Sequence, residues 1–299
     1  MCGLEIAMRY GTILKRGAAV GIAVLIVAGV FVARSQAWWS GGHKLCTLAA
    51  ASKLPEDMPK FFRDAGKELA EVCVDPDNWK NVTASHLRST EQPEHFIDLE
   101  YLGDAPIPAQ RYDLLKFYFS KDIDPTKAGT LSYAMIEGYE RLLLAFRDYR
   151  NDPDSEIVKK RIIVYAGWMA HYSEDCAMPL HTTKDYDGRN LVGGAVEQKG
   201  IHGRIDAYPE KNGITAEKIA EGLAAKDTIN VWPLVVDAIK VSHTHVDECY
   251  KLDANGAFDR DPEAGRELML ERTRAGAKLT LDLWYSAWTN SDPKRATVK

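Results

Sequence analysis

The chain has 299 residues, of which 45% are hydrophobic and 27% charged, and its formal net charge is −5 at pH 7. An acidic chain without a basic run is a poor non-specific binder of polyanions. A phosphate-bearing ligand would therefore have to be held by local positive charge, for which bound divalent metal ions are one source.

Residues 1–37 have the layout of a secretory signal. A basic pair precedes an apolar run over 18–33, and small residues permit cleavage between Ala37 and Trp38. The run is borderline for crossing a bilayer, so an uncleaved membrane anchor is the alternative. Removing this segment, whose net charge is +3, leaves −8 on residues 38–299, which are long enough for one large domain. We expect an exported domain, periplasmic or extracellular, or membrane-tethered if the segment is retained.

Helical periodicity dominates the rest of the chain, and no alternating pattern of any length predicts a strand. The expected fold is therefore all-α, a single-domain multi-helix bundle. Two long segments, roughly 75–110 and 182–212, are irregular and contain several Gly or Pro, which is unusual in a compact domain unless they serve a site. The expected helices cover about 43–54, 59–74, 128–149, 154–177, 214–225, 228–250 and 262–289.

Apart from Cys2 in the expected signal segment, the chain has four cysteines: Cys46, Cys73, Cys176 and Cys249. An even number in an exported protein predicts structural disulfides, with the connectivity left open and buried free thiols as the alternative. No Cys-x-x-Cys pair is present, which argues against a cysteine-based zinc knuckle or a thioredoxin-like redox site.

The end of one expected helix carries the strongest chemical signal. His171 and Asp175 are four residues apart, so they share a helix face and can present an imidazole and a carboxylate to one metal ion. Pro179 then ends the helix, and the turn lets His181 approach from another direction. Taken alone, the pattern also fits a helix-surface ion pair followed by an unrelated loop histidine.

His202 and Asp206 repeat the same spacing and could complete a second site with His181. Imidazole and carboxylate ligands without thiolate suit zinc, more than manganese or iron. Two metal ions about 3.5–4 Å apart form a clamp for in-line displacement at phosphorus. The segment 93–98 adds a further histidine, His95.

The segment that begins with Trp38 is a candidate for a third site. Cleavage before Trp38 would create an α-amino group that can chelate a metal ion together with the carbonyl oxygen of the same residue. His43 is close enough in the sequence to join it. The alternative is an aromatic pair, Trp38 and Trp39, that packs on the core.

These motifs follow the order Trp-x4-His, His-Phe-x-Asp, His-x3-Asp-x5-His and His-x3-Asp between Trp38 and Asp206. In this respect the chain resembles the superfamily that joins bacterial zinc-dependent phospholipase C to the single-strand-specific nucleases named P-one and S-one. The resemblance implies a mainly α-helical fold in which three zinc ions line a cleft. Beyond Asp206 only the helical character is similar.

The resemblance also implies a ligand set for three Zn²⁺ ions per chain. Asp77 and Asp175 are expected to take part in catalysis as well, although Asp75 stays open as an alternative to Asp77. His86, His243 and His245 match no motif. The implied ligands are Asp77, His95, His171 and Asp175 for the first ion, His181, His202 and Asp206 for the second, and Trp38, His43 and a bridging oxygen of Asp175 for the third.

The implied activity is hydrolysis of a phosphodiester by a hydroxide that bridges metal ions. The favoured substrate is single-stranded DNA or RNA, with 3′-nucleotidase activity as a further expectation, because the short Trp-x4-His start and the final Asp206 resemble the nucleases, whereas the phospholipases usually have a longer first spacing and Glu at the last position. Phe96 and Asp98 align with nuclease residues that stack on a base and hydrogen-bond it, but a similar His-Phe-x-Asp motif also occurs among the phospholipases. Core packing is the alternative role for Phe96. Phospholipase C activity on lipid head groups and a non-catalytic zinc-binding protein are the alternative functions. No protein partner and no oligomeric state are implied.

Overall fold

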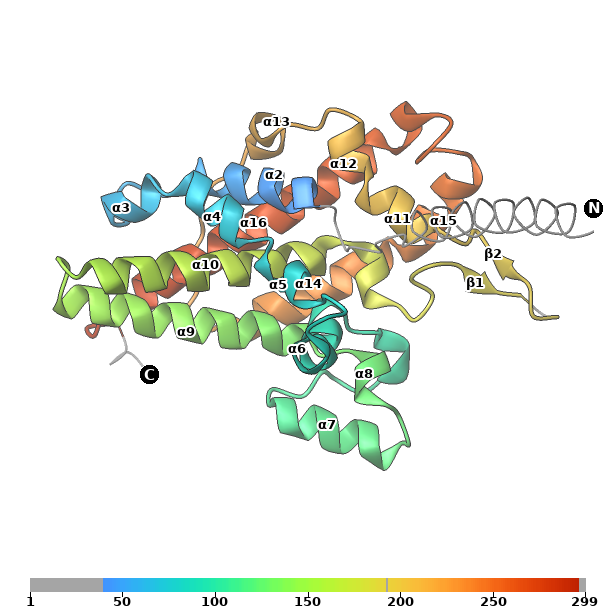
Figure 1. Ribbon diagram of the computed structural model, residues 1–299, viewed down its shortest axis with the longest axis horizontal. Coiled ribbons are helices and arrows are strands. Elements are labelled where there is room, and N and C mark those ends of the chain that lie inside the picture. The colour runs from blue at the N-terminus through green and yellow to red at the C-terminus, as the bar shows by residue number, and fades with distance from the viewer. Residues whose placement is uncertain (1–39, 192, 296–299) are drawn as a thin grey trace, which may run out of the picture. The chain divides into compact units, whose positions relative to one another are not determined.

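A computed structural model of the chain describes residues 40–191 and 193–295, and these are mainly helical (Figure 1). The predicted all-α class is confirmed. Within these residues the strands are limited to β1 (Arg189–Asn190) and β2 (Val196–Glu197), which pair antiparallel. Every helix of this described part is too short or too polar for a membrane span. The expected signal segment and Trp38 lie outside the described residues.

Three long helices form the centre of the fold: α9 (Leu131–Asn151), α10 (Glu156–Ala177) and α16 (Arg266–Asn290). The helix α10 packs against both others, as Figure 1 shows. The indole nitrogen of Trp284 donates a 3.1 Å hydrogen bond to the carbonyl oxygen of Ala166, which ties α16 to α10. The last three turns of α10 are almost wholly buried, so whatever they carry faces protein rather than solvent.

Two expected helices are each broken in two. The range 59–74 contains α3 (Lys60–Arg63) and α4 (Gly66–Val72), because Ala65 leaves the helical conformation with φ −87° and ψ 17°. The break lets α4 pack against both α10 and α2 (Ser40–Ala51), and tertiary contacts of this kind override local helix propensity.

The second break divides the range 228–250 at His245. It separates α14 (Trp232–Thr244) from α15 (Val246–Ala254). A further helix, α7 (Arg111–Ser120), lies where none was predicted. The remaining elements are α5 (Asp75–Trp79), α6 (Ser85–Glu91), η1 (Gln92–His95), η2 (Leu99–Tyr101), α8 (Pro125–Ala128), η3 (Pro179–Thr182), α11 (Ile201–Asp206), α12 (Tyr208–Lys211), α13 (Ala216–Ala220) and η4 (Pro262–Gly265).

The expected disulfides are absent from the described residues, where Cys46, Cys73, Cys176 and Cys249 are all buried free thiols. Burial raises the pKa of each of the four thiols, so they stay protonated and inert. The disulfide prediction was therefore wrong. An even number of cysteines and a presumed compartment give no information about which side chains face one another, and here each packs as a small apolar side chain.

Gly167 on α10 allows a close contact that matters for the site. A Cβ atom at Gly167 would lie 2.6 Å from Cγ1 of Val72 and 3.2 Å from the backbone nitrogen of Cys73. Any larger residue would push the end of α4 away from α10. The close approach brings the carbonyl oxygen of Cys73 within 2.8 Å of Nδ1 of His171.

Candidate metal centre

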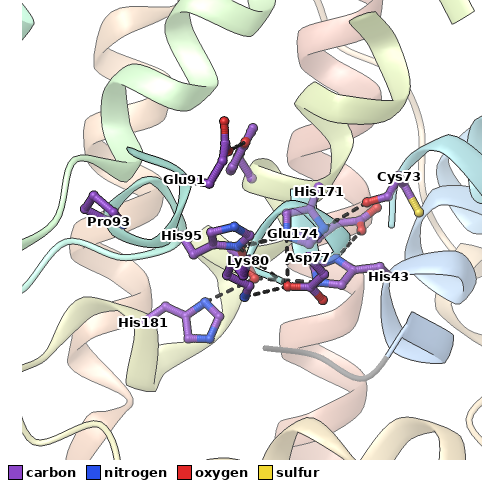
Figure 2. Close-up of polar contacts among 12 residues, drawn as sticks. His43, Cys73, Asp77, Lys80, Glu91, Pro93, His95, His171, Glu174 and His181 are labelled. Carbon is purple, nitrogen blue, oxygen red and sulfur yellow. Dashed lines mark hydrogen bonds and ion pairs between the residues drawn. The ribbon is translucent and has the colours of Figure 1, made fainter. Parts of the chain in front are cut away.

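The first cluster of donor atoms joins α5, η1 and the end of α10 (Figure 2). Nε2 of His171 lies 3.0 Å from Nδ1 of His95 and 3.2 Å from Oδ2 of Asp175, and His95 Nδ1 lies 2.9 Å from that same oxygen. Oδ1 of Asp77 lies 3.9 Å from His95 Nδ1 and 3.8 Å from His171 Nε2. Donors placed about 2.0–2.1 Å from one tetrahedral zinc ion are about 3.3 Å apart, so these spacings fit a single ion.

Local structure explains how these side chains are aimed. His171 donates its Nδ1 proton to the Cys73 carbonyl oxygen, which leaves Nε2 for the cluster. Pro76 suits the first turn of α5, from which Asp77 reaches the cluster. Asp75 instead accepts a 3.1 Å hydrogen bond from the indole nitrogen of Trp168. The geometry therefore favours Asp77 over Asp75 as the metal-facing residue.

The second cluster contains His181, His202 and Asp206, whose donor atoms lie within 4.8 Å of one another. The two Nε2 atoms of His181 and His202 are 3.0 Å apart, and His202 Nε2 is 3.3 Å from Oδ2 of Asp206. Pro179 follows the last turn of α10 and begins η3, which turns His181 inward. His243 supports this turn, because its Nδ1 lies 3.0 Å from the carbonyl oxygen of Thr182.

The third cluster contains His43, His171 and Asp175. Nε2 of His43 lies 3.5 Å from Oδ1 of Asp175, and its ring stacks on that of His171 with the centroids 3.9 Å apart. Oδ1 of Asp175 is also 3.1 Å from Nδ1 of His181. Asp175 therefore stands where all three clusters meet. Trp38, the other residue expected here, lies outside the described part of the chain.

Buried polar atoms without a hydrogen-bond partner concentrate in these clusters. Such atoms are costly unless something else satisfies them, and a cation would do so here. Imidazole and carboxylate donors without thiolate suit zinc, so the residues present fit the expected ion. In the described residues, eight of the thirteen such atoms belong to His43, Asp77, His95, Asp175, His181 and Asp206, although some of the eight have an ion-pair contact, such as Asp77 Oδ1 with Lys80 and Asp175 Oδ1 with His181 Nδ1.

Burial controls the protonation of the histidines. It is the main cause that lowers the pKa of His43 and of His95, and it brings the pKa of His202 to about 3. In His171 burial acts in the same direction, but the carboxylates of Asp175 and Asp77 outweigh it and raise the pKa. Three of the imidazoles are thus held neutral, which is the form that binds a metal ion.

The pKa values of two buried aspartates are shifted in opposite directions. Burial disfavours the charged form of Asp175, but the neighbouring His171 and His181 outweigh it and hold the pKa well below its usual range. Burial raises the pKa of Asp206, and repulsion from Asp175 adds to the effect. The second cluster therefore contains a carboxylate that needs a nearby cation to ionise.

Two charged residues beside the clusters were missed by the sequence analysis. The ammonium of Lys80 lies 2.6 Å from Oδ1 of Asp77, amid the labelled donors in Figure 2, and its side chain is 16% exposed. The three-residue spacing between them could have indicated this only if α5 had been predicted. The other residue, Glu174, contacts His43 and stands beside Asp175 in the sequence, hidden inside the motif itself.

The candidate substrate residues Phe96 and Asp98 lie beside the second cluster. The backbone nitrogen of Ile97, between them, donates a 2.9 Å hydrogen bond to the carbonyl oxygen of His181. Phe96 is half-buried, and Asp98 is only 4% exposed. Burial, with a smaller contribution from Glu100, raises the pKa of Asp98 to about 8.

A pH-dependent effect on stability is expected from Asp98. Its folded pKa of about 8 lies above the value of 3.8 in an unfolded chain, so the folded protein holds the extra proton and loses stability as pH rises between the two values. Asp98→Asn removes this loss. We expect the variant to gain about 1–3 kcal/mol relative to wild type between pH 5 and pH 9, or at least about 3 °C in melting temperature.

The measurement is a series of thermal melts of both proteins across that pH range at one metal concentration. Asp154→Asn, which changes an exposed aspartate, is the matched control and should give a constant difference. A difference between Asp98→Asn and wild type that does not change with pH would contradict the assignment.

No protein-family model matches the chain, and no curated protein matches its sequence. Among solved structures, a crystal structure of Clostridium perfringens alpha-toxin from an avian strain is similar, with 13% sequence identity and a TM-score of 0.45. Alpha toxin from Clostridium absonum is similar with 14% identity and a TM-score of 0.44. Each comparison covers 86% of this chain but 65% of the toxin, so this chain spans less than two thirds of the toxins' length. A likeness at this level concerns the fold alone.

Proposed function

We propose that this protein is an exported zinc-dependent phosphodiester hydrolase that acts on single-stranded nucleic acid. The observation that carries the proposal is the concentration of unsatisfied, buried imidazole and carboxylate atoms in three adjoining clusters. A purely structural core would not retain such atoms without partners. Their close spacing favours a multinuclear centre, which suits attack on a phosphodiester.

The residues that would hold three zinc ions fall into three sets, and Asp175 would be shared between the first and third sets. Zinc bound there would supply Lewis acidity and an acidified water molecule. Export with cleavage before Trp38 is part of the proposal, since it creates the amino group of the third set. The sets are Asp77, His95, His171 and Asp175; His181, His202 and Asp206; and Trp38, His43 and Asp175.

Lys80 would bind the substrate phosphate in this proposal. Its ammonium pairs with Asp77 at the edge of the first cluster and its side chain is partly exposed, so a phosphate that reaches the cluster would meet it. A fixed positive charge at this position stabilises the negative charge that builds on a non-bridging oxygen during the reaction. The overall acidic chain thus provides positive charge where the substrate needs it.

Lys80→Met is expected to lower kcat/KM by about 10²–10³-fold, as removal of one such stabilising group does elsewhere. Zinc content should stay unchanged, because no zinc donor is removed. Steady-state kinetics and metal analysis of the same samples measure both quantities. Lys116→Met, at a side chain 78% exposed on α7, is the control and should be neutral. A wild-type kcat/KM in Lys80→Met would remove Lys80 from the reaction.

Phe96 and Asp98 support nucleic acid as the substrate. Phe96 is only partly buried, and an aromatic ring that remains accessible offers a stacking surface that accepts any base. Asp98, with its pKa near 8, is mainly protonated at neutral pH and can both donate and accept a hydrogen bond, as the edge of a base requires. These properties make the pair suitable for holding a nucleotide next to the second cluster.

A second candidate function, phospholipase C, is favoured by one cavity. A pocket of about 390 Å³ is lined by Trp79, Tyr165, Trp168 and Glu91, and its wall includes Tyr172. The ring of Tyr172 packs on His95 of the first cluster, which connects the pocket to the site. The lining has aromatic faces and three carboxylates against two guanidinium groups, which suits a cationic group such as the ammonium of a lipid head group.

One experiment separates the candidate functions. Zinc-loaded protein that begins at Trp38 is assayed in parallel on single-stranded DNA, RNA, a 3′-nucleotide and phosphatidylcholine vesicles, with His171→Ala as the inactive control. We expect cleavage of the single-stranded nucleic acids and no release of the lipid head group. The opposite pattern would identify a phospholipase C, and cleavage of none by a fully zinc-loaded sample would leave a non-catalytic zinc-binding protein.

A further inference from the structure

Glu174 contacts His43 at Nδ1, the ring nitrogen that does not face Asp175. It is 2% exposed, and both of its carboxylate oxygens are occupied. Oε2 lies 2.8 Å from Nδ1 of His43, and Oε1 accepts a 2.7 Å hydrogen bond from the hydroxyl of Thr47. Figure 2 shows Glu174 and His43 side by side next to the cluster.

Two consecutive carboxylates therefore bracket one imidazole. Glu174 contacts Nδ1 of His43, and Asp175 lies 3.5 Å from Nε2. An acceptor at Nδ1 keeps the proton on that nitrogen, so the lone pair of Nε2 points toward Asp175. Nε2 of His43 is buried and has no hydrogen-bond partner, which is the state expected of a donor that awaits a metal ion.

The cost of burying Glu174 shows that the residue does more than fill space. Within the described residues Glu174 forms an ion-pair contact with His43, and no lysine or arginine of this part pairs with it. The helix α16 closes over it at Gly276, where a Cβ atom would lie 3.2 Å from Cα of Glu174. A buried carboxylate adds little stability compared with an apolar residue of the same size, and specificity of geometry is one reason to keep one.

We propose that Glu174 is a positioning residue that fixes the ring and the tautomer of His43 so that Nε2 faces the third cluster. The proposal rests on the proposed function, because it assigns His43 to a zinc ion. Glu174 touches neither the substrate nor the metal. It would orient the imidazole by accepting the Nδ1 proton of His43, and its hydrogen bond from Thr47 would hold its own carboxyl group in place.

The test compares three variants of the zinc-loaded protein that begins at Trp38. Glu174→Gln keeps one oxygen as an acceptor for His43 but replaces the other oxygen with an amide nitrogen, whereas Glu174→Leu loses both oxygens. Ser173→Ala is the matched control, since its hydroxyl bonds the carbonyl oxygen of Met169 on the same helix, away from His43. Zinc affinity is measured by competition with a chelator, and the His43 tautomer by nitrogen NMR on zinc-free protein.

We expect one of the bound zinc ions to be weakened by about 10–100-fold in Glu174→Leu and by less in Glu174→Gln, with the other ions and the control unchanged. His43 should carry its proton on Nδ1 in wild type and in Glu174→Gln, and should lose this preference in Glu174→Leu. Unchanged zinc affinity in both variants, or no Nδ1 preference in wild type, would overturn the proposal.

Two measurements keep this test separate from that of the proposed function. If Glu174→Leu does not fold, the zinc affinities of Glu174→Gln and the His43 tautomer of the wild-type protein still decide whether Glu174 positions His43. A wild-type protein that binds no zinc would refute the proposed function, whereas the tautomer would still show whether Glu174 orients His43.

Discussion

Asp175→Asn is expected to lower kcat/KM by more than about 10³-fold, equivalent to a barrier higher by about 4 kcal/mol. The side chain keeps its size but loses its charge, and an amide nitrogen cannot replace a carboxylate oxygen as a metal ligand. Oδ2 of Asp175 lies 2.9 Å from His95 and 3.2 Å from His171, while Oδ1 lies 3.1 Å from His181. The change therefore disturbs every cluster at once.

Zinc content shows whether this loss arises at the metal centre. We expect Asp175→Asn to lose at least one ion and to bind a second more weakly, in parallel with the loss of activity. His245→Ala is the control, because His245 pairs with Glu248, at 2.9 Å, and belongs to none of the three clusters. An Asp175→Asn protein with full zinc content and wild-type turnover would refute the shared role of Asp175.

Removal of zinc is expected to lower the melting temperature by at least about 10 °C. Asp77, Asp175 and Asp206 are at most 4% exposed, so without cations their mutual repulsion and lost hydration destabilise the fold. A site that is saturated 1,000-fold above its Kd adds about 4 kcal/mol to stability. Each kcal/mol corresponds to about 2–4 °C in a domain of this size.

Thermal melts with and without a chelator measure the effect. Adding zinc back to chelated protein should restore the melting temperature, whereas magnesium should not, since Mg²⁺ prefers oxygen ligands to imidazoles. Identical melting curves for the chelated and the zinc-loaded protein would show that the clusters hold no ion. Their unsatisfied atoms would then need another explanation.

Spacing on a helix indicated which side chains lie together at the centre of the site, but taken alone it also fitted a helix-surface ion pair. His171 and Asp175 were predicted to share a face of one helix, and they do, because a strong 3.6-residue pattern placed them on α10. The positions of His43 and His95 in the site came from the order of motifs alone. The choice between Asp75 and Asp77 depended on which side chain turns toward Trp168, and no pattern in the sequence predicts that orientation.

Other features depend on contacts between distant segments. The break at Ala65 follows from the packing of α4 against α2 and α10, and the pattern of residues 59–74 is helical on both sides of it. Glu174 looks like an ordinary helix residue until α2 brings His43 and Thr47 to it. For the same reason the four thiols could be counted from the sequence but not paired.

The spread of the donors along the chain has a consequence for biosynthesis. They come from positions between His43 and Asp206, and α16, which packs against both α2 and α10, follows all of these positions in the sequence. Bringing such distant segments together costs chain entropy before one ion can be bound by donors from all of them. Capture of the metal ions by the complete ligand set should therefore come late, after α16 has docked on α2 and α10.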